Sequence, residues 1–271
     1  MKRYLKYIII GIVAVALYTL LFPKKEKEKS EPRDYQAIVE SGVLRAVTEY
    51  NSISYFADGD TVSGFHYELL NAFARSKGLA PEITPEMSFE KRQEGILTGK
   101  YDILANSTIV TSESKDSLLF THPILLNKQV LVQRKPEQEN DSMYIHSQLE
   151  LARKTLHVVK GSPALLRIHN LSNEIGDTIY IQEVEKYGPE QLLAMVAHGD
   201  IDYTVCDESI AQASINDFPQ LDIETAISFT QFYSWGVSKH SPILLDSLNA
   251  WLDTYTQTPE FRKLQKKYYN K

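Results

Sequence analysis

The sequence lacks most of the features that mark disulfide scaffolds and low-complexity proteins. It has 271 residues and a single cysteine, Cys206, so an intramolecular disulfide and a thiolate metal cluster are both excluded. With only 12 glycines and 11 prolines, the chain has little room for long flexible linkers. The composition is 43% apolar and 24% charged, as in ordinary folded proteins, and the length allows two modest domains or lobes.

Motifs that carry common enzyme chemistry are also missing. The seven histidines show no H-x-H or H-E-x-x-H spacing, and no carboxylates stand at the spacing of a metal-binding loop. There is no G-x-S-x-G, no G-x-x-x-x-G-K-[ST] and no G-x-G-x-x-G. We therefore expect no metal, no nucleotide and no other cofactor.

Charge is distributed unevenly along the chain. The net charge is -6, yet the first 30 residues carry seven Lys or Arg and only two Glu. The rest of the chain is therefore more acidic than the whole. Because binding to phosphate backbones needs clustered basic residues, we expect no nucleic-acid partner.

One long hydrophobic run lies near the start, at residues 7–22, flanked by basic residues. At about 1.5 Å per residue it would span about 24 Å as a helix, slightly less than a hydrocarbon core of ~30 Å. Tyrosines and lysines at its ends can lie in the membrane interface. We predict an uncleaved transmembrane helix, with residues 1–33 forming an anchor and a charged tether. The alternative is a secretory signal cleaved after Ala16, where Ala14 completes an A-x-A pattern.

Either alternative predicts a body outside the cytoplasm. With an uncleaved anchor, the protein would be a single-pass protein of the cell inner membrane whose folded part lies in the periplasm. With cleavage near Ala16, it would be secreted to the periplasm.

Apolar periodicity then alternates between β-rich runs and helical windows, which predicts an α/β protein. The pattern forms two sets. The first has helices at 34–41, 65–77 and 89–98 and strands at 43–48, 82–84 and 102–105. The second has helices at 147–153, 164–173 and 189–198 and strands at 155–159, 178–184 and 201–206. β-like runs at 127–134 and 233–238 separate the sets, and helices at 242–256 and 259–268 end the chain. Two such sets predict a cleft between them, lined by the carboxyl ends of strands.

Four segments, taken in order, resemble the extracellular solute-binding proteins of family 3, the periplasmic amino-acid-binding type. They are GVLRAVTEYNSISYF at 42–56, SGFHYELLNAFARSKGL at 63–79, GKYDILANSTIVTSESKDSLLFTHP at 99–123 and HGDIDYTVCDESIA at 198–211. The similarity covers residues 35–269. In particular, the chain resembles the non-catalytic N-terminal domain of membrane-bound lytic murein transglycosylases of the F type. The catalytic half of those proteins is expected to be absent.

This resemblance implies a two-lobed periplasmic-binding-protein-like fold (type II), with a hinge and an interlobe cleft. Lobe 1 would comprise residues 34–133 plus 234–271, and lobe 2 would comprise residues 134–233. The crossovers would lie at 132–136 and 231–235. Closure of the hinge would bury a solute between the lobes.

The resemblance also implies ligand-binding residues. Asp207 matches the carboxylate that pairs with a ligand ammonium, although it could equally be the N-cap of the following helix. Gly161 and Ser162 match a turn that holds a ligand carboxylate, and the alternative is a plain capping turn. Pro163, which lacks an N–H, weakens this anion site.

The largest departure from the family pattern lies in NSTIVTSESKDSLLF. Ser114 stands at the position of the family's arginine, Ile109 at that of a hydroxyl residue and Ser107 at that of a glycine. The arginine clamp for an α-carboxylate is therefore missing. Lys115 is adjacent, but the turn is expected to point it elsewhere.

Residues after the first strand complete the predicted site. Tyr50 and Tyr55 correspond to a loop that stacks on ligand in relatives, with lobe packing as the alternative. Glu49 would add negative charge to a site shared with Asp207, which favours an ammonium-bearing ligand; the alternative is a solvated strand end.

Together these features predict a membrane-anchored, extracytoplasmic, non-enzymatic solute-binding protein that closes around a small polar ligand for sensing or transport. The ligand would be amino-acid-like, a peptide or a cell-wall fragment. The predicted ligand-binding residues are Glu49, Tyr50, Tyr55, Asn106, Ser107, Thr108, Ser114, Gly161, Ser162 and Asp207; no catalytic or metal-binding residue is predicted. Predicted partners are the ligand, the membrane, and a membrane transporter, a sensor or a peptidoglycan enzyme.

Two alternatives stay open at this point. The first is a regulatory or interaction module for peptidoglycan enzymes that has lost ligand binding. The second is a dehydratase on the same fold that uses the cleft carboxylates Glu49 or Asp207 as bases.

Overall fold

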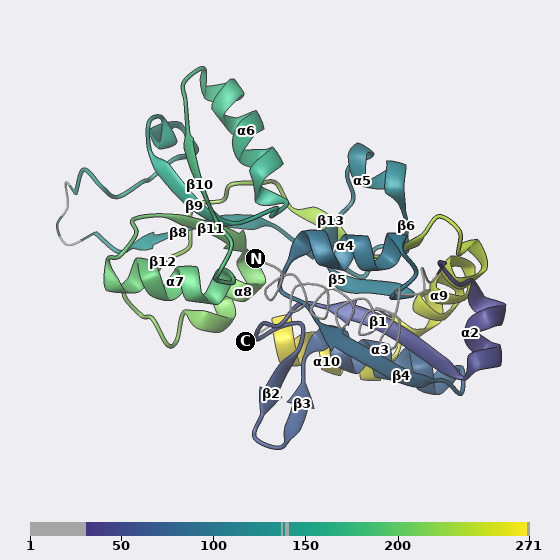
Figure 1. The fold of residues 1–271 in the computed structure, drawn as a ribbon. Helices are drawn as coiled ribbons and strands as arrows, with labels where there is room; N and C mark the ends of the chain where they lie inside the picture. The colour runs from purple at the N-terminus through teal and green to yellow at the C-terminus, as the bar shows by residue number, and fades with distance from the viewer. Residues whose placement is uncertain (1–30, 137, 139–140, 270–271) are drawn as a thin grey trace, which may run out of the picture. The chain divides into compact units, whose positions relative to one another are not determined.

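Two β-sheets, each with helices on both faces, organise the part of the chain that the structure describes (Figure 1). The computed structural model describes residues 31–136, 138 and 141–269. Residues 31–271 form one compact unit.

The first sheet has the strand order β4-β1-β5-β13-β6, with β7 also paired to β13. Its strands are β1 (Val43–Thr48), β4 (Ala80–Pro85), β5 (Ile103–Ile109), β6 (Leu118–Phe120), β7 (Leu125–Asn127) and β13 (Gln231–Ser238). β1 is parallel to β4 and β5, and β13 is antiparallel to its neighbours. Strand β13 thus joins the end of the chain to the sheet formed by its beginning.

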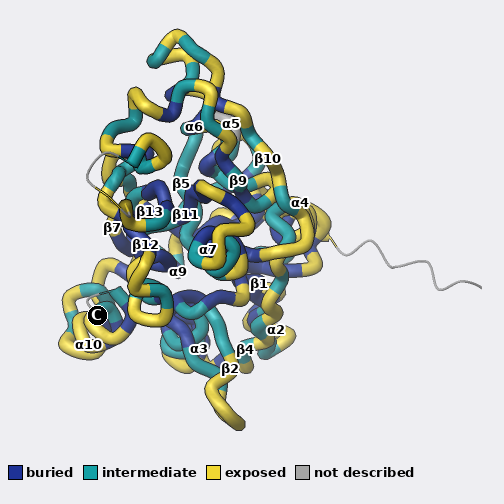
Figure 2. Tube along the Cα trace, turned by 90° about the vertical axis from the view of Figure 1, so that its left-hand side faces the viewer, coloured by how far each residue is buried: buried dark blue, intermediate teal, exposed yellow. Residues whose placement is uncertain are grey.

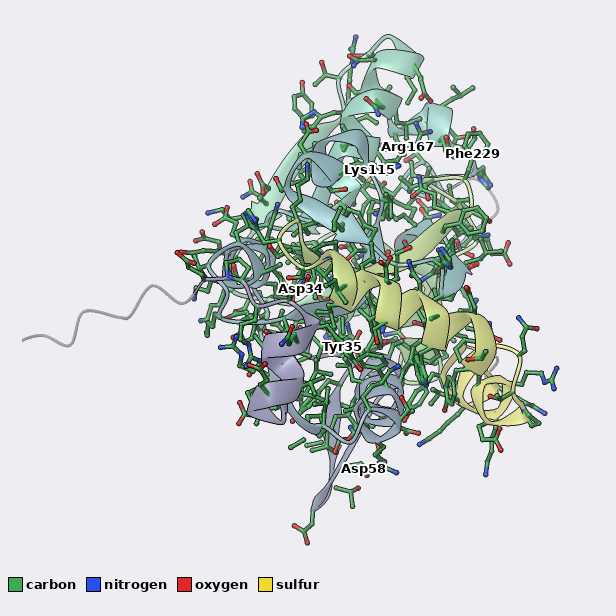
Figure 3. The ribbon with its side chains drawn as sticks, turned by 90° about the vertical axis from the view of Figure 1, so that its right-hand side faces the viewer. Asp34, Tyr35, Asp58, Lys115, Arg167 and Phe229 are labelled. Atoms are coloured by element: carbon green, nitrogen blue, oxygen red, sulfur yellow. The ribbon has the colours of Figure 1, made fainter. Side chains whose placement is uncertain are left out.

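The second sheet has the order β10-β9-β11-β8-β12. Its strands are β8 (Gln129–Arg134), β9 (Thr155–Val159), β10 (Tyr180–Val184), β11 (Thr204–Asp207) and β12 (Leu221–Asp222). A separate hairpin, β2 (Phe56–Asp58) and β3 (Thr61–Ser63), extends from the first half, with Asp58 near its tip (Figure 3).

Helices cover both sheets. They are α2 (Tyr35–Ser41), α3 (Phe65–Ser76), α4 (Phe89–Leu97), α5 (Ser112–Ser117), α6 (Ala164–Ile175), α7 (Pro189–His198), α8 (Glu208–Ser214), α9 (Pro242–Tyr255) and α10 (Pro259–Tyr269), with a 3₁₀ helix η1 (Gln148–Leu151). Helices α2, α4 and α5 begin with a side-chain cap. The Ser88 hydroxyl, for example, accepts a hydrogen bond from the Lys91 N–H at the start of α4.

Alternation along the strands sorts apolar residues to the two faces of each sheet. In β5, Ile103 and Ala105 join the core under α3 and α9, whereas Leu104 joins the core under α4. In β8, Leu131 packs toward α6, and its two neighbours pack toward α7 and α8. The inner strands β8 and β13 are accordingly among the most buried parts of the chain (Figure 2). Each sheet therefore has its own core on both faces, as expected of two lobes.

The crossovers lie a few residues from their expected positions. The predicted run 127–134 is divided, because β7 pairs with β13 in the first sheet while β8 pairs with β11 and β12 in the second. The chain therefore passes between the sheets near Lys128 and returns through residues 223–230. Strand pairing, which single-chain periodicity does not report, decides this. The lobe boundaries at 133/134 and 233/234 stay a prediction, and pairing favours boundaries near 128 and 230.

Within the described residues, no helix is long and apolar enough to cross a membrane. The predicted span at 7–22 lies outside those residues.

Candidate functional site

The two sheets meet at a cleft that contains two adjoining cavities, of about 40 Å³ and 630 Å³. The residues that line both are Phe89, Ile109, Gln129, Ser162 and Pro163. Strands β1, β5, β9 and β11 end here, so the cleft lies at the carboxyl ends of parallel strands, where α/β proteins bind ligands.

The two lobes contact each other beside the small cavity. The Ser52 N–H donates a hydrogen bond of 2.8 Å to Oε1 of Glu190 at the start of α7. A Cβ atom added to Gly161 would lie 3.4 Å from Cβ of Phe89. The structure therefore has the cleft at least partly closed.

Asp207 ends β11 and lines the small cavity. It is the N-cap of α8, but its side chain makes no capping hydrogen bond to that helix. Its Oδ1 instead accepts a hydrogen bond of 2.8 Å from the Tyr233 hydroxyl. Burial raises the pKa of Asp207 to about 7, which the Tyr233 hydrogen bond opposes and the charge of Glu49 reinforces. The carboxylate thus faces the cleft, as a ligand-binding group would.

Glu49 follows β1 on the opposite lobe and lines the same cavity. It is 8% exposed, so it is not a solvated strand end. Burial raises its pKa; the charge of Arg92 opposes this shift and that of Glu190 adds to it. The small cavity is therefore bordered by two carboxylates, the buried Glu49 from one lobe and the half-buried Asp207 from the other.

Arg92 on α4 is a cleft residue that the sequence reasoning missed. It is 1% exposed, and its Nη1 donates to the carbonyl oxygens of Glu86 (2.5 Å) and Met87 (2.9 Å). Its Nη2 lies 3.8 Å from Oε2 of Glu49, and among the described residues Nε and Nη2 have no hydrogen-bond partner. The sequence contained one signal for this: Arg92 is spaced to lie on the same helix face as the apolar residues Phe89 and Ile96.

The turn at 161–164 has little capacity for an anion. The Gly161 N–H donates to Oε2 of Glu183, the Ser162 N–H to the Val159 carbonyl, and the Ala164 N–H to the Ser162 hydroxyl oxygen. Pro163 contributes no N–H. The plain capping turn is therefore the better description, and only the Ser162 hydroxyl retains a donor for the cleft.

Ser114, at the position of the family's arginine, lines the larger cavity but is engaged in its own turn. Its N–H donates to Oγ1 of Thr111, and its hydroxyl oxygen accepts from the Thr111 N–H while its hydroxyl donates to the Thr111 carbonyl. Together they form a capping box at the start of α5. Lys115 is exposed and lines neither cavity, as expected (Figure 3).

Strand β5 brings the three predicted residues 106–108 to the cleft. Asn106 and Thr108 line the larger cavity, and the Thr108 hydroxyl donates to Oδ1 of Asn106 (3.0 Å). Ser107 points to the other side and lines the small cavity with Asp207 and Glu49. Alternation along the strand thus divides the three residues between the two cavities.

The two predicted tyrosines lie outside both cavities. Tyr50 is 44% exposed, and the ring of Tyr55 packs on Tyr67 with centroids 5.5 Å apart. Packing within the lobe, the alternative that the sequence left open, describes Tyr55. Their contact with a ligand stays a prediction.

Other contributors to the cleft come from elements that the sequence did not assign to a site. Gln129 is 2% exposed, lines both cavities, and within the described chain its Oε1 has no hydrogen-bond partner. His66 is 1% exposed; its Nδ1 accepts from Nε1 of Trp235 (3.0 Å), and its Nε2 lies 3.4 Å from the Ser107 hydroxyl oxygen. Burial lowers the pKa of His66 to about 3.

This arrangement does not suit a serine nucleophile. A general base must present an unprotonated nitrogen to the hydroxyl. Because an indole N–H is only a donor, it fixes Nδ1 of His66 as the unprotonated nitrogen and Nε2 as the one that carries hydrogen. Within the described residues, no group of His, Cys, Asp and Glu side chains could hold a metal ion.

Comparison with known proteins places these features in a family. The model of bacterial extracellular solute-binding proteins, family 3, matches residues 44–271. The chain is 26% identical over 266 residues to membrane-bound lytic murein transglycosylase F of Photobacterium profundum, covering 95% of this chain and 50% of the relative. The chain thus spans about half the length of the curated relatives it matches.

Solved structures share the fold. One is an amino acid ABC transporter substrate-binding protein, AbpA, from Streptococcus pneumoniae, bound to L-arginine, with a TM-score of 0.74, 20% identity and coverage of 87% of this chain and 98% of that chain. Another is an ancestral amino-acid-binding protein, a precursor of cyclohexadienyl dehydratase, with a TM-score of 0.73, 22% identity and coverage of 86% and 98%. These matches confirm the predicted two-lobed fold. The family and these neighbours are binding proteins, which agrees with the expectation that the chain is not an enzyme.

Proposed function

We infer that this chain, which belongs to the bacterial extracellular solute-binding proteins of family 3, binds a small polar ligand that carries an ammonium or similar cationic group. The observation that carries this proposal is the pair of carboxylates, the buried Glu49 and the half-buried Asp207, on opposite lobes of one cavity. A ligand cation placed between them would offset their desolvation and their mutual repulsion.

Closure follows from the same electrostatics. With the cleft open, water solvates both carboxylates; with it closed and empty, both lose water and face each other. A cation that contacts both lobes binds the closed state better than the open one, and this difference in affinity shifts the population toward closure. The ligand thereby becomes the link between the lobes.

The larger cavity would receive the rest of the ligand. Its volume of about 630 Å³ and its polar wall of Asn106, Thr108 and Gln129 suit an amino-acid-like molecule, a peptide or a cell-wall fragment. An α-carboxylate would not find the family's arginine clamp, because Ser114 stands there and its hydroxyl is engaged. The arginine bound to the structural neighbour favours a cationic amino acid as the first probe.

Anchoring and biological role are part of the proposal. The hydrophobic run at 7–22 and the membrane-bound relatives support a protein that is tethered to the inner membrane and has its folded part in the periplasm. A tether would hold the receptor beside a membrane transporter, a sensor or a peptidoglycan enzyme, so that ligand-driven closure is detected locally.

The test is thermal unfolding of the full chain against free amino acids, di- and tripeptides, muropeptides and sugars. A ligand at 100 times its Kd adds about 2.7 kcal/mol of stability. At about 2–4 °C per kcal/mol for a chain of this size, Tm should rise by roughly 5–10 °C. Asp207→Ala should abolish the shift, and Asp58→Ala at the hairpin tip is the matched control that should retain it.

One alternative function has an observation in its favour. The backbone N–H groups of the 161–164 turn and the Ser114 hydroxyl, which the family resemblance assigns to a ligand carboxylate, all have partners within the protein. A chain without a Tm shift on the whole panel would therefore be assigned to the interaction module for peptidoglycan enzymes.

A further inference from the structure

The last helix, α10, is basic in an otherwise acidic molecule. The first 30 residues, with seven Lys or Arg and two Glu, contribute +5 to the net charge of -6, which leaves -11 for residues 31–271. Helix α10, by contrast, has four Lys or Arg and one Glu. The four basic residues are Arg262, Lys263, Lys266 and Lys267, and all are exposed. An anionic partner would therefore meet attraction at this helix and repulsion from the folded part as a whole.

The apolar side of α10 faces the core. Phe261, Leu264 and Tyr268 are buried and pack with the residues beneath α3 and α9. Their spacing of three and four residues places them on one side of the helix, so the exposed basic residues lie on the other. The outer face of α10 therefore offers a partner charged groups rather than an apolar surface (Figure 2).

A groove between α3 and α10 collects part of this charge. Its volume is about 420 Å³, and the basic residues that line it are Arg75 from α3 and Lys263 and Lys267 from α10. Lys267 is paired across the groove with Glu68, at 2.6 Å. Among the described residues, Arg75 and Lys263 form no ion pair. Both therefore remain available to an anion.

Carboxylates limit the charge of the groove itself. Glu68 and Glu260 line it together with the three basic residues, so alone it is only weakly positive. Arg262 and Lys266, which are exposed but do not line the groove, extend the positive charge over the outer face of α10. An extended anionic surface would contact both regions at once, whereas a single small anion would contact only one.

The start of the folded part is close enough to α10 for a membrane to reach both. The Leu244 N–H at the start of α9 donates to Oδ1 of Asp34 (2.8 Å), so the first described residues lie at that end of α9. Helix α9 has 14 residues, a length of about 21 Å, and α10 follows it after a short turn. Residues 23–30 span at most about 29 Å when extended. The predicted span at 7–22 and α10 can therefore contact the same bilayer.

We propose that the outer face of α10, together with the α3–α10 groove, is a docking surface for a bilayer of anionic phospholipids. Arg75 and Lys263 contact headgroup phosphates at the groove, and Arg262 and Lys266 contact the surrounding surface. This inference goes beyond ligand binding and rests on the proposed function only for the membrane anchor. Because the anchor holds the folded part beside lipid headgroups, a bilayer is favoured over an acidic protein as the partner.

Docking through this face leaves the hinge free to close. The residues of the groove all come from α3, α9 and α10, which pack in one core beneath the first sheet. No wall of the groove is contributed by the described residues of the second sheet and its helices. Lobe 1 would therefore stay on the bilayer while lobe 2 moves.

The experiment places the full chain in phosphatidylcholine nanodiscs with or without phosphatidylglycerol and follows lysine acetylation by acetic anhydride with mass spectrometry. Each basic residue near an anionic membrane contributes about fivefold to its binding. Lys263 and Lys266 should therefore react at least about fivefold more slowly on the anionic discs, because docking covers their amines and favours the charged form. Lys91, exposed on α4, should react equally on both. Salt at about 0.5 M should remove the difference.

Charge reversal tests which residues are responsible. Arg262→Glu with Lys266→Glu should abolish the protection of Lys263. The matched control, Lys91→Glu with Lys115→Glu, changes the net charge by the same amount away from α10 and should retain the protection. All four side chains are exposed, so both double variants should keep the Tm of the wild type.

The outcomes separate docking from anchoring. A full chain that does not elute with the discs removes the proposed anchor and this inference with it. Equal reaction of the α10 lysines on both kinds of disc leaves the anchor standing and overturns the docking surface. Protection on neutral discs by dissolved glycerol phosphate would assign the groove to a soluble phosphate, and protection there by polyglutamate alone would assign the face to an acidic protein. Either result overturns the proposal.

Discussion

Burial shifts the pKa values of two side chains in the cleft region in opposite directions. It raises the pKa of Asp207 to about 7 and lowers that of His66 to about 3, because in both cases it disfavours the charged form. The neutral histidine has one fixed hydrogen and can orient Ser107. The carboxylate, by contrast, is ready to ionise fully when a cation arrives.

Asp207→Asn should change the pH dependence of stability. The native pKa of about 7 exceeds the ordinary value of 3.8, so the native state binds the proton more tightly than the unfolded state. The stability contributed by this proton is complete below pH 3.8 and is lost as pH rises to about 7. Asparagine keeps the acceptor for Tyr233 without the charge. The variant should therefore gain up to about 4 kcal/mol over wild type at pH 8 and nothing near pH 4.

Urea denaturation at pH 4, 6 and 8 checks this expectation. Asp58→Asn, on the exposed hairpin, is the control and should follow wild type at every pH. An Asp207→Asn variant that is destabilised equally at all three values would contradict the assigned burial of the carboxylate.

At the scale of an element, helix α4 places a charge where its pattern calls for an apolar side chain. Arg92 lies between Phe89 and Ile96 on the buried side, and its guanidinium stacks over the Phe89 ring at 4.3 Å. It holds the segment before the helix through two carbonyl oxygens and supplies the positive charge nearest to Glu49. Helix α4 thus contributes Ile96 to the core and Arg92 to the cleft.

Arg92→Leu should destabilise the protein by roughly 3 kcal/mol at pH 8, because it leaves the Glu49 carboxylate buried without its counter-charge. Burial already raises the pKa of Glu49, and removing Arg92 raises it further. The loss should therefore shrink as the pH falls, because Glu49 then takes up a proton.

The double variant Arg92→Leu with Glu49→Gln separates charge from packing. It should recover a large part of the stability at pH 8, measured by urea denaturation as the free energy of unfolding. If the single and double variants unfold alike, the ion pair is not the reason for the arginine.

At the scale of the whole molecule, the proposed function needs the folded part outside the cytoplasm and held near the membrane. A tether at residues 23–30, after the hydrophobic run, would limit how far residues 31–271 move from the bilayer. Ligand-driven closure would then be presented to partners in the same membrane.

A C-terminal alkaline phosphatase fusion should be active and should sediment with membranes, because the enzyme folds only after export. The same fusion without residues 1–30 is the control and should be inactive. A full-length fusion that is inactive, while a fluorescent-protein fusion glows in the cytoplasm, would refute the proposed orientation.

The sequence by itself determined the α/β class, the alternation of helices and strands, and the placement of Glu49 and Asp207 at strand ends. These features depend on local periodicity and on residues that follow one another in the chain. The strands 43–48 and 155–159 and the helix 189–198 have the predicted bounds. Family resemblance added the two-lobed arrangement, which the structural neighbours confirm.

Tertiary structure decided which groups the cleft offers to a ligand. In the folded chain the N–H groups of the 161–164 turn donate hydrogen bonds within the protein. Tyr50 and Tyr55 line neither cavity, whereas Arg92 and Gln129 do. His66 lies behind Ser107. The physical reason is distance along the chain. The Trp235–His66 hydrogen bond joins residues 169 positions apart, and such partners follow from how sheets and helices pack, which local periodicity does not encode.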